Sequence, residues 1–156
     1  MKLVVNRCYG GFSLSPRAVK RLAELEGKNC YFFKMKIGDE SYTPITIEEI
    51  EDGGRISFWV AFTHPNPCDV LKAIKNWHDM TQEERGAYNK LYQEINIDSR
   101  PEDRANKNLV RVVEELGKKA NGAFANLEVV EIPDGVDWEI DDYDGMETIH
   151  EKHRSW

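Results

Sequence analysis

The sequence predicts an α+β (or α/β) fold, with one mixed sheet of about five strands and helices packed on it. Strand-like apolar runs alternate with segments of helical periodicity along all 156 residues. A strand–helix–strand order at the front favours parallel pairing, and a turn near the end favours a hairpin. The length and the 40% hydrophobic content indicate one globular domain, residues 1–156, with a buried core.

The chain opens with a strand, a loop and a helix. Residues 3–5 are apolar and partly β-branched, which is typical of a buried strand. Gly10 and Gly11 end this strand, because glycine adopts backbone angles that other residues avoid. Ser15 suits a helix N-cap, with Pro16 in the first turn, and a helix is expected from there to the C-cap glycine at position 27.

Two further strands are expected in the first half of the chain. Residues 30–37 are aromatic and then alternate between apolar and charged, and residues 55–63 form the clearest central strand, with apolar bulk on both faces. Residues 42–50 are open to two interpretations. They are either a strand or the site of a capping box at Thr46 and Glu49 that begins one helical turn.

Three helices are expected next. Asn66 caps the first, and a capping box at Thr81 begins the second. Residues 96–106 are polar and predict a loop. The third helix has the best periodicity, with apolar residues at i, i+3, i+4 and i+7 over 109–116, and the Asn-Gly pair at 121–122 is expected to end it.

The last third of the chain predicts a hairpin and a short helix. Residues 127–132 form a strand, residues 133–135 have the composition of a turn, and residues 136–140 are expected to return as the hairpin partner. A short helix is expected from about Met146 to His153.

Composition restricts the partners of the protein. The formal net charge of −7 argues against non-specific binding to nucleic acid or to an anionic membrane. The cysteines Cys8, Cys30 and Cys68 are odd in number and have no C-x-x-C spacing, which fits a reducing compartment without a disulfide framework. No signal region and no apolar run of membrane-spanning length is present, so an intracellular protein is expected.

The glycine loop before the first helix is the candidate ligand site. Free N–H groups at a helix N-terminus favour an anion, and Arg7 adds a fork of donors. The loop has neither the P-loop spacing nor G-x-G-x-x-G, so a tight turn with a capping serine is the plainer alternative. The tail adds a basic and an aromatic side chain that suit stacking on a base. The candidate ligand-binding residues are Arg7, Tyr9, Gly10, Gly11, Ser13, Ser15, Arg154 and Trp156.

Other chemistry has weaker support. Glu147, His150 and His153 recur every three residues and would share a face of the expected C-terminal helix, as metal ligands do. A solvated acidic surface is the commoner outcome of such a charged run. Cys8 is expected to be a small buried hydrophobe, and nothing in the sequence brings it to His153 as nucleophile and base. No catalytic residue and no cofactor is therefore predicted.

Three stretches resemble a family of small, largely uncharacterised bacteriophage proteins: the start NRCYGGFSLS, the segment NLVRVVEELGKKANGAFANLEVVEIPDGVDWEIDDYDG and the ending IHEKHRSW. Residues 29–106 are not covered by the resemblance. The resemblance implies a protein of the host cytoplasm in an infected bacterium. It favours two roles: sequestering a host signalling nucleotide, or inhibiting a host protein.

Three functions are therefore weighed. The first is a non-catalytic binder of a small anionic ligand, such as a cyclic nucleotide or an ADP-ribose derivative, which acts as a counter-defence sponge and forms a homo-oligomer. The second is an acidic protein–protein inhibitor of a host factor, which predicts no pocket and instead a contiguous negative surface with exposed aromatic residues. The third is a small metal-dependent hydrolase.

Overall fold

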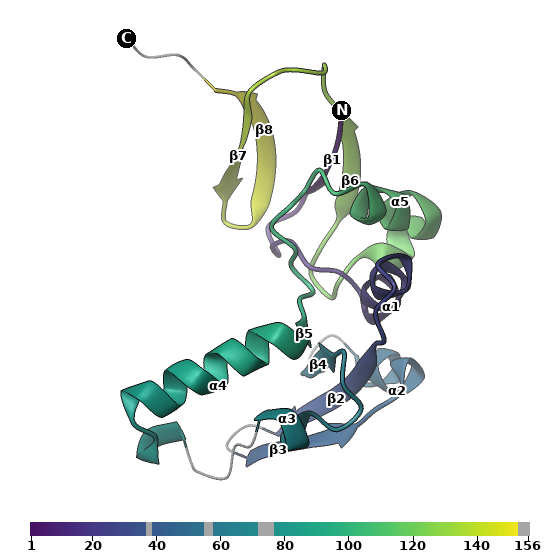
Figure 1. The fold of residues 1–156 in the computed structure, drawn as a ribbon. Coiled ribbons are helices and arrows are strands. Elements are labelled where there is room, and N and C mark those ends of the chain that lie inside the picture. Colours follow the sequence, from purple (N-terminus) through teal and green to yellow (C-terminus); the bar gives the residue numbers. More distant parts are fainter. Residues whose placement is uncertain (37–38, 55–57, 72–76, 153–156) are drawn as a thin grey trace. The chain divides into compact units, whose positions relative to one another are not determined.

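The structure, a computed structural model, describes residues 1–36, 39–54, 58–71 and 77–152. The fold is α+β, as the sequence predicts, and it has two compact units (Figure 1). Unit 1 combines residues 1–26 with residues 99–156, and unit 2 is the segment 27–98 between them. The prediction that the whole chain forms a single domain stays a prediction.

Unit 1 has a core between two helices and a pair of strands. Strand β1 (Lys2–Asn6) pairs antiparallel with β6 (Leu127–Glu131), and helix α5 (Lys107–Leu116) contacts both strands and helix α1 (Pro16–Leu25). A 3-10 turn, η2 (Gly117–Ala120), follows α5. The side chains buried in this core are Leu3, Val4, Val5, Leu14, Val19, Leu109 and Val112. Apolar residues at helical spacing on α1 and α5 thus bury the apolar run of β1.

The C-terminal part of unit 1 is a separate hairpin. Strand β7 (Trp138–Tyr143) pairs antiparallel with β8 (Met146–Glu151). Asp144 and Gly145 connect them with φ angles of 51° and 87°. Two successive positive φ angles are typical of a type I′ turn, whose twist matches that of the strands it joins.

The described residues of unit 2 form a four-stranded antiparallel sheet and four helical segments. The strand order is β3 (Asp39–Pro44), β2 (Tyr31–Lys36), β4 (Trp59–Phe62) and β5 (Asn96–Ile97). The helical segments are α2 (Ile47–Asp52), α3 (Pro67–Leu71), η1 (Trp77–Asp79) and α4 (Gln82–Ile95).

The core of unit 2 is aromatic. Phe62 is fully buried, and the rings of Tyr42 and Tyr92 meet it edge-on at centroid distances of 5.1 and 5.5 Å. Edge-to-face contacts of this kind are favourable for aromatic rings. Burial raises the pKa of Tyr42 and of Tyr92, so both phenols stay neutral. The aromatic residues of this core therefore serve mainly to pack unit 2.

Several local predictions are confirmed. The side chain of Ser15 accepts a hydrogen bond from the Ala18 N–H and caps α1. Thr46 and Thr81 each form a full capping box, with Glu49 and Glu84, so the ambiguous segment 42–50 ends one strand and begins α2. Capping is read correctly from sequence because it depends on neighbouring residues only.

Other predictions are wrong. The strands form three antiparallel sheets within the described ranges rather than one mixed sheet. Strand β6 pairs with β1 and not with residues 136–140, since Trp138–Tyr143 form β7 and pair with β8, which is the segment expected to be the C-terminal helix. Helix α5 ends at Leu116, before the Asn-Gly pair, and the 3-10 turn η2 then continues to Ala120 with Asn121 as its C-cap. Residues 96–97 form β5, and the start of the expected central strand, 55–57, lies outside the described residues.

None of the helices in the described part of the chain is long and apolar enough to span a bilayer.

Candidate functional site

Three aromatic side chains of unit 1 are largely exposed to solvent. Tyr9, Phe124 and Tyr143 have exposed fractions of 62%, 54% and 75%. Tyr9 follows β1, Phe124 precedes β6, and Tyr143 ends β7. Large apolar rings are normally buried, so exposed rings that come together point to an interaction site.

The loops that carry these three rings converge through glycines. A Cβ atom at Gly10 would overlap the backbone carbonyl of Phe124, so only glycine permits this approach. A Cβ atom at Gly145 would overlap the backbone N of Gly11 and also meet the Tyr9 carbonyl. The backbone around the first ring is therefore in contact with both other loops. We call the surface formed by Tyr9, Phe124 and Tyr143 the aromatic loop surface.

A buried asparagine holds the three loops together. The Nδ2 of Asn6 donates to the carbonyl oxygens of Cys8 and Gly145, both at 2.6 Å. Its Oδ1 accepts from the backbone N–H of Asn126 at 2.7 Å. Asn6 is fully buried, so its side chain replaces water as the partner of these backbone groups. The Asn6 side chain thus connects the loop of Tyr9, the loop of Phe124 and the turn that follows Tyr143.

The buried carboxylate of Glu147 attaches the hairpin to β1 and to Arg104. The carboxylate of Glu147 accepts from the Asn6 backbone N–H at 2.8 Å and from Arg104 Nη2 at 2.9 Å. The side chains of Arg104 and Glu147 are only 14% and 4% exposed. The Arg104 guanidinium also lies over the Phe12 ring, 3.3 Å from its centroid, in a cation–π contact.

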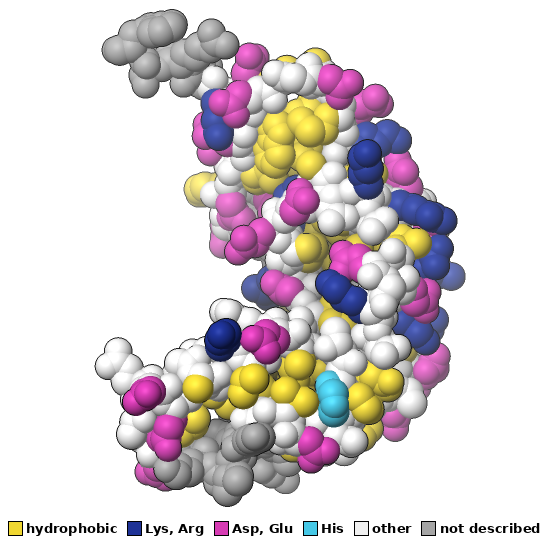
Figure 2. All heavy atoms as spheres, in the orientation of Figure 1, with side chains coloured by type: hydrophobic (Ala, Val, Ile, Leu, Met, Phe, Trp, Pro, Cys, Tyr) yellow, Lys and Arg dark blue, Asp and Glu magenta, His cyan; other side chains and the backbone are white. Residues whose placement is uncertain are grey.

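The surroundings of the aromatic loop surface are acidic. Asp141, Asp142 and Asp144 are exposed near the tip of the β7–β8 hairpin, next to Tyr143. Figure 2 shows hydrophobic side chains (yellow) gathered beside this hairpin, with Asp and Glu side chains (magenta) around them. Such a surface attracts a basic partner and repels an acidic one.

Three backbone donors of the segment predicted to bind an anion are used inside the protein. The backbone N–H groups of Arg7, Leu14 and Ser15 donate to the carbonyls of Asn126, Ser99 and Ala120. The hydroxyl of Ser15 donates to the Lys119 carbonyl in addition to capping α1. The capping serine of the plainer alternative is therefore present, and the ligand-binding role of the loop stays a prediction.

The other predicted site residues lie as follows. Arg7 donates from Nη1 to the Glu147 carbonyl at 3.2 Å, and its Nε lies 3.9 Å from a carboxylate oxygen of Glu128. The backbone carbonyl of Ser13 accepts from Gly122 N–H, and the Ser13 side chain lies beside that glycine. Tyr9, Gly10 and Gly11 belong to the converging loops. Arg154 and Trp156 lie outside the described residues.

The prediction that Glu147, His150 and His153 share one face of a helix is wrong. Because β8 is a strand, Glu147 and His150 point to opposite faces instead of sharing one. Glu147 is buried in its ion pair, while His150 is exposed and its Nε2 lies 3.1 Å from the Thr148 hydroxyl. His153 lies outside the described residues. Within the described ranges, no three His, Cys, Asp or Glu side chains are grouped to hold a metal ion.

Cys8 is half-buried rather than a buried hydrophobe, which corrects the sequence expectation. Its Sγ lies 3.0 Å from the Phe124 carbonyl oxygen and 3.3 Å from Asn6 Oδ1. The thiol therefore packs between the loop that carries Tyr9 and the loop that carries Phe124.

No protein-family model, no curated protein and no solved structure matches this chain. The candidate site therefore depends on its geometry alone. Sequence reasoning missed Asn6, Phe124 and Tyr143 as site residues. One signal for Tyr143 was present, because the Asp-Gly pair at 144–145 is a strong hairpin signal that places its neighbours at an exposed tip.

Gly10→Ala is expected to disrupt the aromatic loop surface. The added Cβ overlaps backbone atoms of Phe124, which cannot move without shifting β6, so we expect a loss of about 2–4 kcal/mol in unfolding free energy. Gly86→Ala in α4 is the matched control, since nothing lies near its Cβ position, and it should stabilise by about 0.5–1 kcal/mol. Denaturant unfolding checks both, and equal effects of the two variants would contradict the close approach.

Proposed function

We propose that this chain is a non-catalytic bacteriophage protein of the host cytoplasm, which binds a host protein through the aromatic loop surface. The observation that supports this function is that three exposed rings are carried by loops whose backbones meet at two glycines and are fixed by Asn6. Tyrosine and other aromatic residues dominate binding energy at protein interfaces, and a rigid support lowers the entropic cost of association.

The charge of the surface defines the partner. Exposed aspartates beside Tyr143 and a net charge of −7 favour a protein with a basic contact surface. The association rate should therefore fall as the salt concentration rises. The same charge opposes an anionic nucleotide at these rings, which ranks the sponge role second.

The bacteriophage context comes from the sequence resemblance. All three resembling stretches lie in unit 1, which also carries the aromatic loop surface. The segment that the resemblance does not cover, 29–106, is nearly the whole of unit 2 with a few residues beyond it. The proposed binding function is therefore assigned to unit 1.

Truncating the three rings tests this function. We expect the combined variant Tyr9→Ala, Phe124→Ala, Tyr143→Ala to fold normally, because the rings are exposed, and to lose affinity for the host partner by at least about thirtyfold. The partner is first identified by capture on the wild-type protein from a bacterial lysate, then purified. Its dissociation constant is measured by calorimetry against both proteins.

Phe58→Ala is the matched control, because Phe58 is an aromatic residue of unit 2 with a similar exposed fraction, 56%. It should leave the dissociation constant unchanged. Unchanged affinity of the combined variant for the purified partner would contradict the proposed function. So would the opposite pattern, in which a cyclic nucleotide or ADP-ribose derivative raises the melting temperature while no protein binds; a hundredfold excess of a true ligand over its dissociation constant adds about 2.7 kcal/mol of stability.

A further inference from the structure

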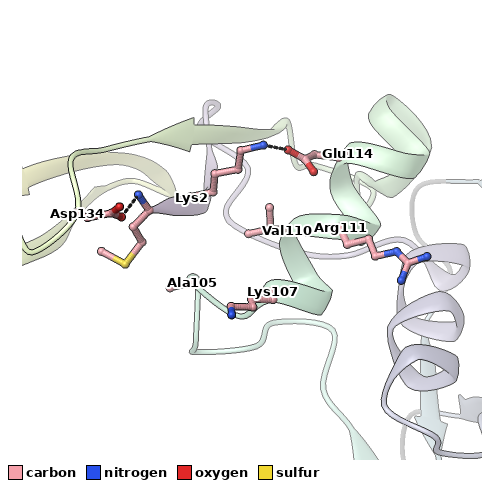
Figure 3. A pocket seen from close by; sticks show the side chains of 8 residues that line it. Lys2, Ala105, Lys107, Val110, Arg111, Glu114 and Asp134 are labelled. Carbon is pink, nitrogen blue, oxygen red and sulfur yellow. Dashed lines mark hydrogen bonds and ion pairs between the residues drawn. The ribbon is translucent and has the colours of Figure 1, made fainter.

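Unit 1 has a cavity that shares no residue with the aromatic loop surface. It has a volume of about 450 Å³ and lies between the first residues of the chain, the beginning of α5 and Asp134 (Figure 3). Sites for small molecules usually have volumes of a few hundred Å³ or more. The cavity is therefore large enough for a small organic molecule.

The floor of this cavity is apolar. Val110 is 7% exposed, and Figure 3 shows its side chain pointing from α5 toward Lys2, into the space between the drawn residues. Ala105 and Met1 contribute further apolar lining. An apolar body placed here would remove this surface from water.

The charge that the rim offers to a ligand is positive. Its two carboxylates are already occupied: Glu114 pairs with Lys2 at 2.6 Å, and Asp134 pairs with the amino group of Met1. Arg111 also lines the cavity, but its side chain extends away and binds Glu115. Among the described residues Lys107 makes no ion pair, and its side chain is exposed. Its ammonium group is therefore available to a ligand.

We infer that this cavity binds a small organic anion, with an apolar body over Val110 and a carboxylate or phosphate group at the ammonium of Lys107. The anion is held here by a side chain and not by the backbone amides of the glycine loop. A single exposed ion pair and a short apolar body give a dissociation constant on the order of a millimolar. The site is independent of the proposed protein contact, so each is tested without the other.

The test uses the full chain, labelled for NMR at backbone amides and valine methyl groups. Hexanoate and hexyl phosphate are titrated as the anionic probes, and hexylammonium is the cationic probe with the same apolar body. We expect saturable shifts of the Val110 methyl and Ala105 amide signals with the anions and not with hexylammonium. Saturation with only one of the two anions shows which head group, carboxylate or phosphate, the cavity prefers. Saturation with both shows that it accepts either anionic group.

Lys107→Glu should weaken anion binding about tenfold, since it removes an attraction and adds a repulsion. Lys90→Glu, the same change at an exposed position of α4, should leave the anion affinity unchanged. Both variants change exposed side chains, so both should fold. The inference is overturned if Val110 does not respond to either anion, if hexylammonium produces the same shifts, or if Lys107→Glu binds as the wild type does.

Discussion

Asn6→Asp is expected to destabilise unit 1 by about 3–5 kcal/mol. The substitution keeps the acceptor for Asn126 N–H but removes two donors, so a buried carboxylate faces the carbonyl oxygens of Cys8 and Gly145. Glu147, whose carboxylate is bound to the Asn6 N–H, adds a second negative charge nearby. This single change therefore affects all three loops of the aromatic loop surface.

The pH dependence of this variant has a defined sign. Burial next to carbonyl oxygens raises the pKa of the new carboxyl in the folded state, because the charged form is disfavoured. The destabilisation is therefore largest above that raised pKa, and it decreases as the pH falls and the carboxyl becomes protonated. Wild type and variant should differ less in stability at pH 5 than at pH 8.

Hydrogen–deuterium exchange of peptides from β1, β6 and the β7–β8 hairpin measures this loss within unit 1 alone. The control is Asn89→Asp, the same chemical change at an exposed position of α4, which should stay within about 0.5 kcal/mol of the wild type. If Asn6→Asp exchanged like the control at both pH values, the side chain of Asn6 would not be the link between the loops.

Breaking the ion pair between Arg104 and Glu147 is expected to cost about 3–5 kcal/mol from either side. Arg104→Met leaves the Glu147 carboxylate buried without its guanidinium, and Glu147→Leu leaves the guanidinium over Phe12 without its carboxylate. The double variant should recover part of this loss, because both desolvated charges are gone, but the buried Asn6 N–H still lacks the acceptor that Glu147 supplied. Denaturant unfolding of the four proteins gives the coupling energy.

The exposed pair of Lys2 and Glu114 is the matched control. Its atoms are closer, at 2.6 Å against 2.9 Å, but its side chains are 47% and 44% exposed. Removing either partner should cost less than about 1 kcal/mol, since water screens the pair. Similar costs for the two pairs would show that burial does not govern the attachment of the hairpin.

The helix starts were predictable because each depends on a few adjacent residues. Ser15, Thr46 and Thr81 accept from N–H groups only three residues later, so the sequence contains both partners of each hydrogen bond. The Asp-Gly pair at 144–145 belongs to the same class of local signals. Reading it would have predicted the β7–β8 hairpin in place of the helix from Met146.

The candidate site was only partly predictable. Tyr9, Gly10 and Gly11 were assigned to a site, but for a ligand at the start of α1, whose donors are used by Ser15 and by distant carbonyls. Phe124 and Tyr143 join them only through contacts between residues more than one hundred positions apart. Neither the hydrophobic periodicity of the sequence nor the spacing of its residues indicates contacts over such distances along the chain.

The sequence by itself determined where helices begin, that the chain mixes strands with helices, and that its surface is acidic, because these follow from neighbouring residues and from composition. Tertiary structure alone decided that β6 pairs with β1 and that Asn6 and Glu147 sit in the interior of unit 1. Strand pairing and the burial of polar groups depend on which distant segments satisfy each other's hydrogen bonds, and that choice is made by the whole fold.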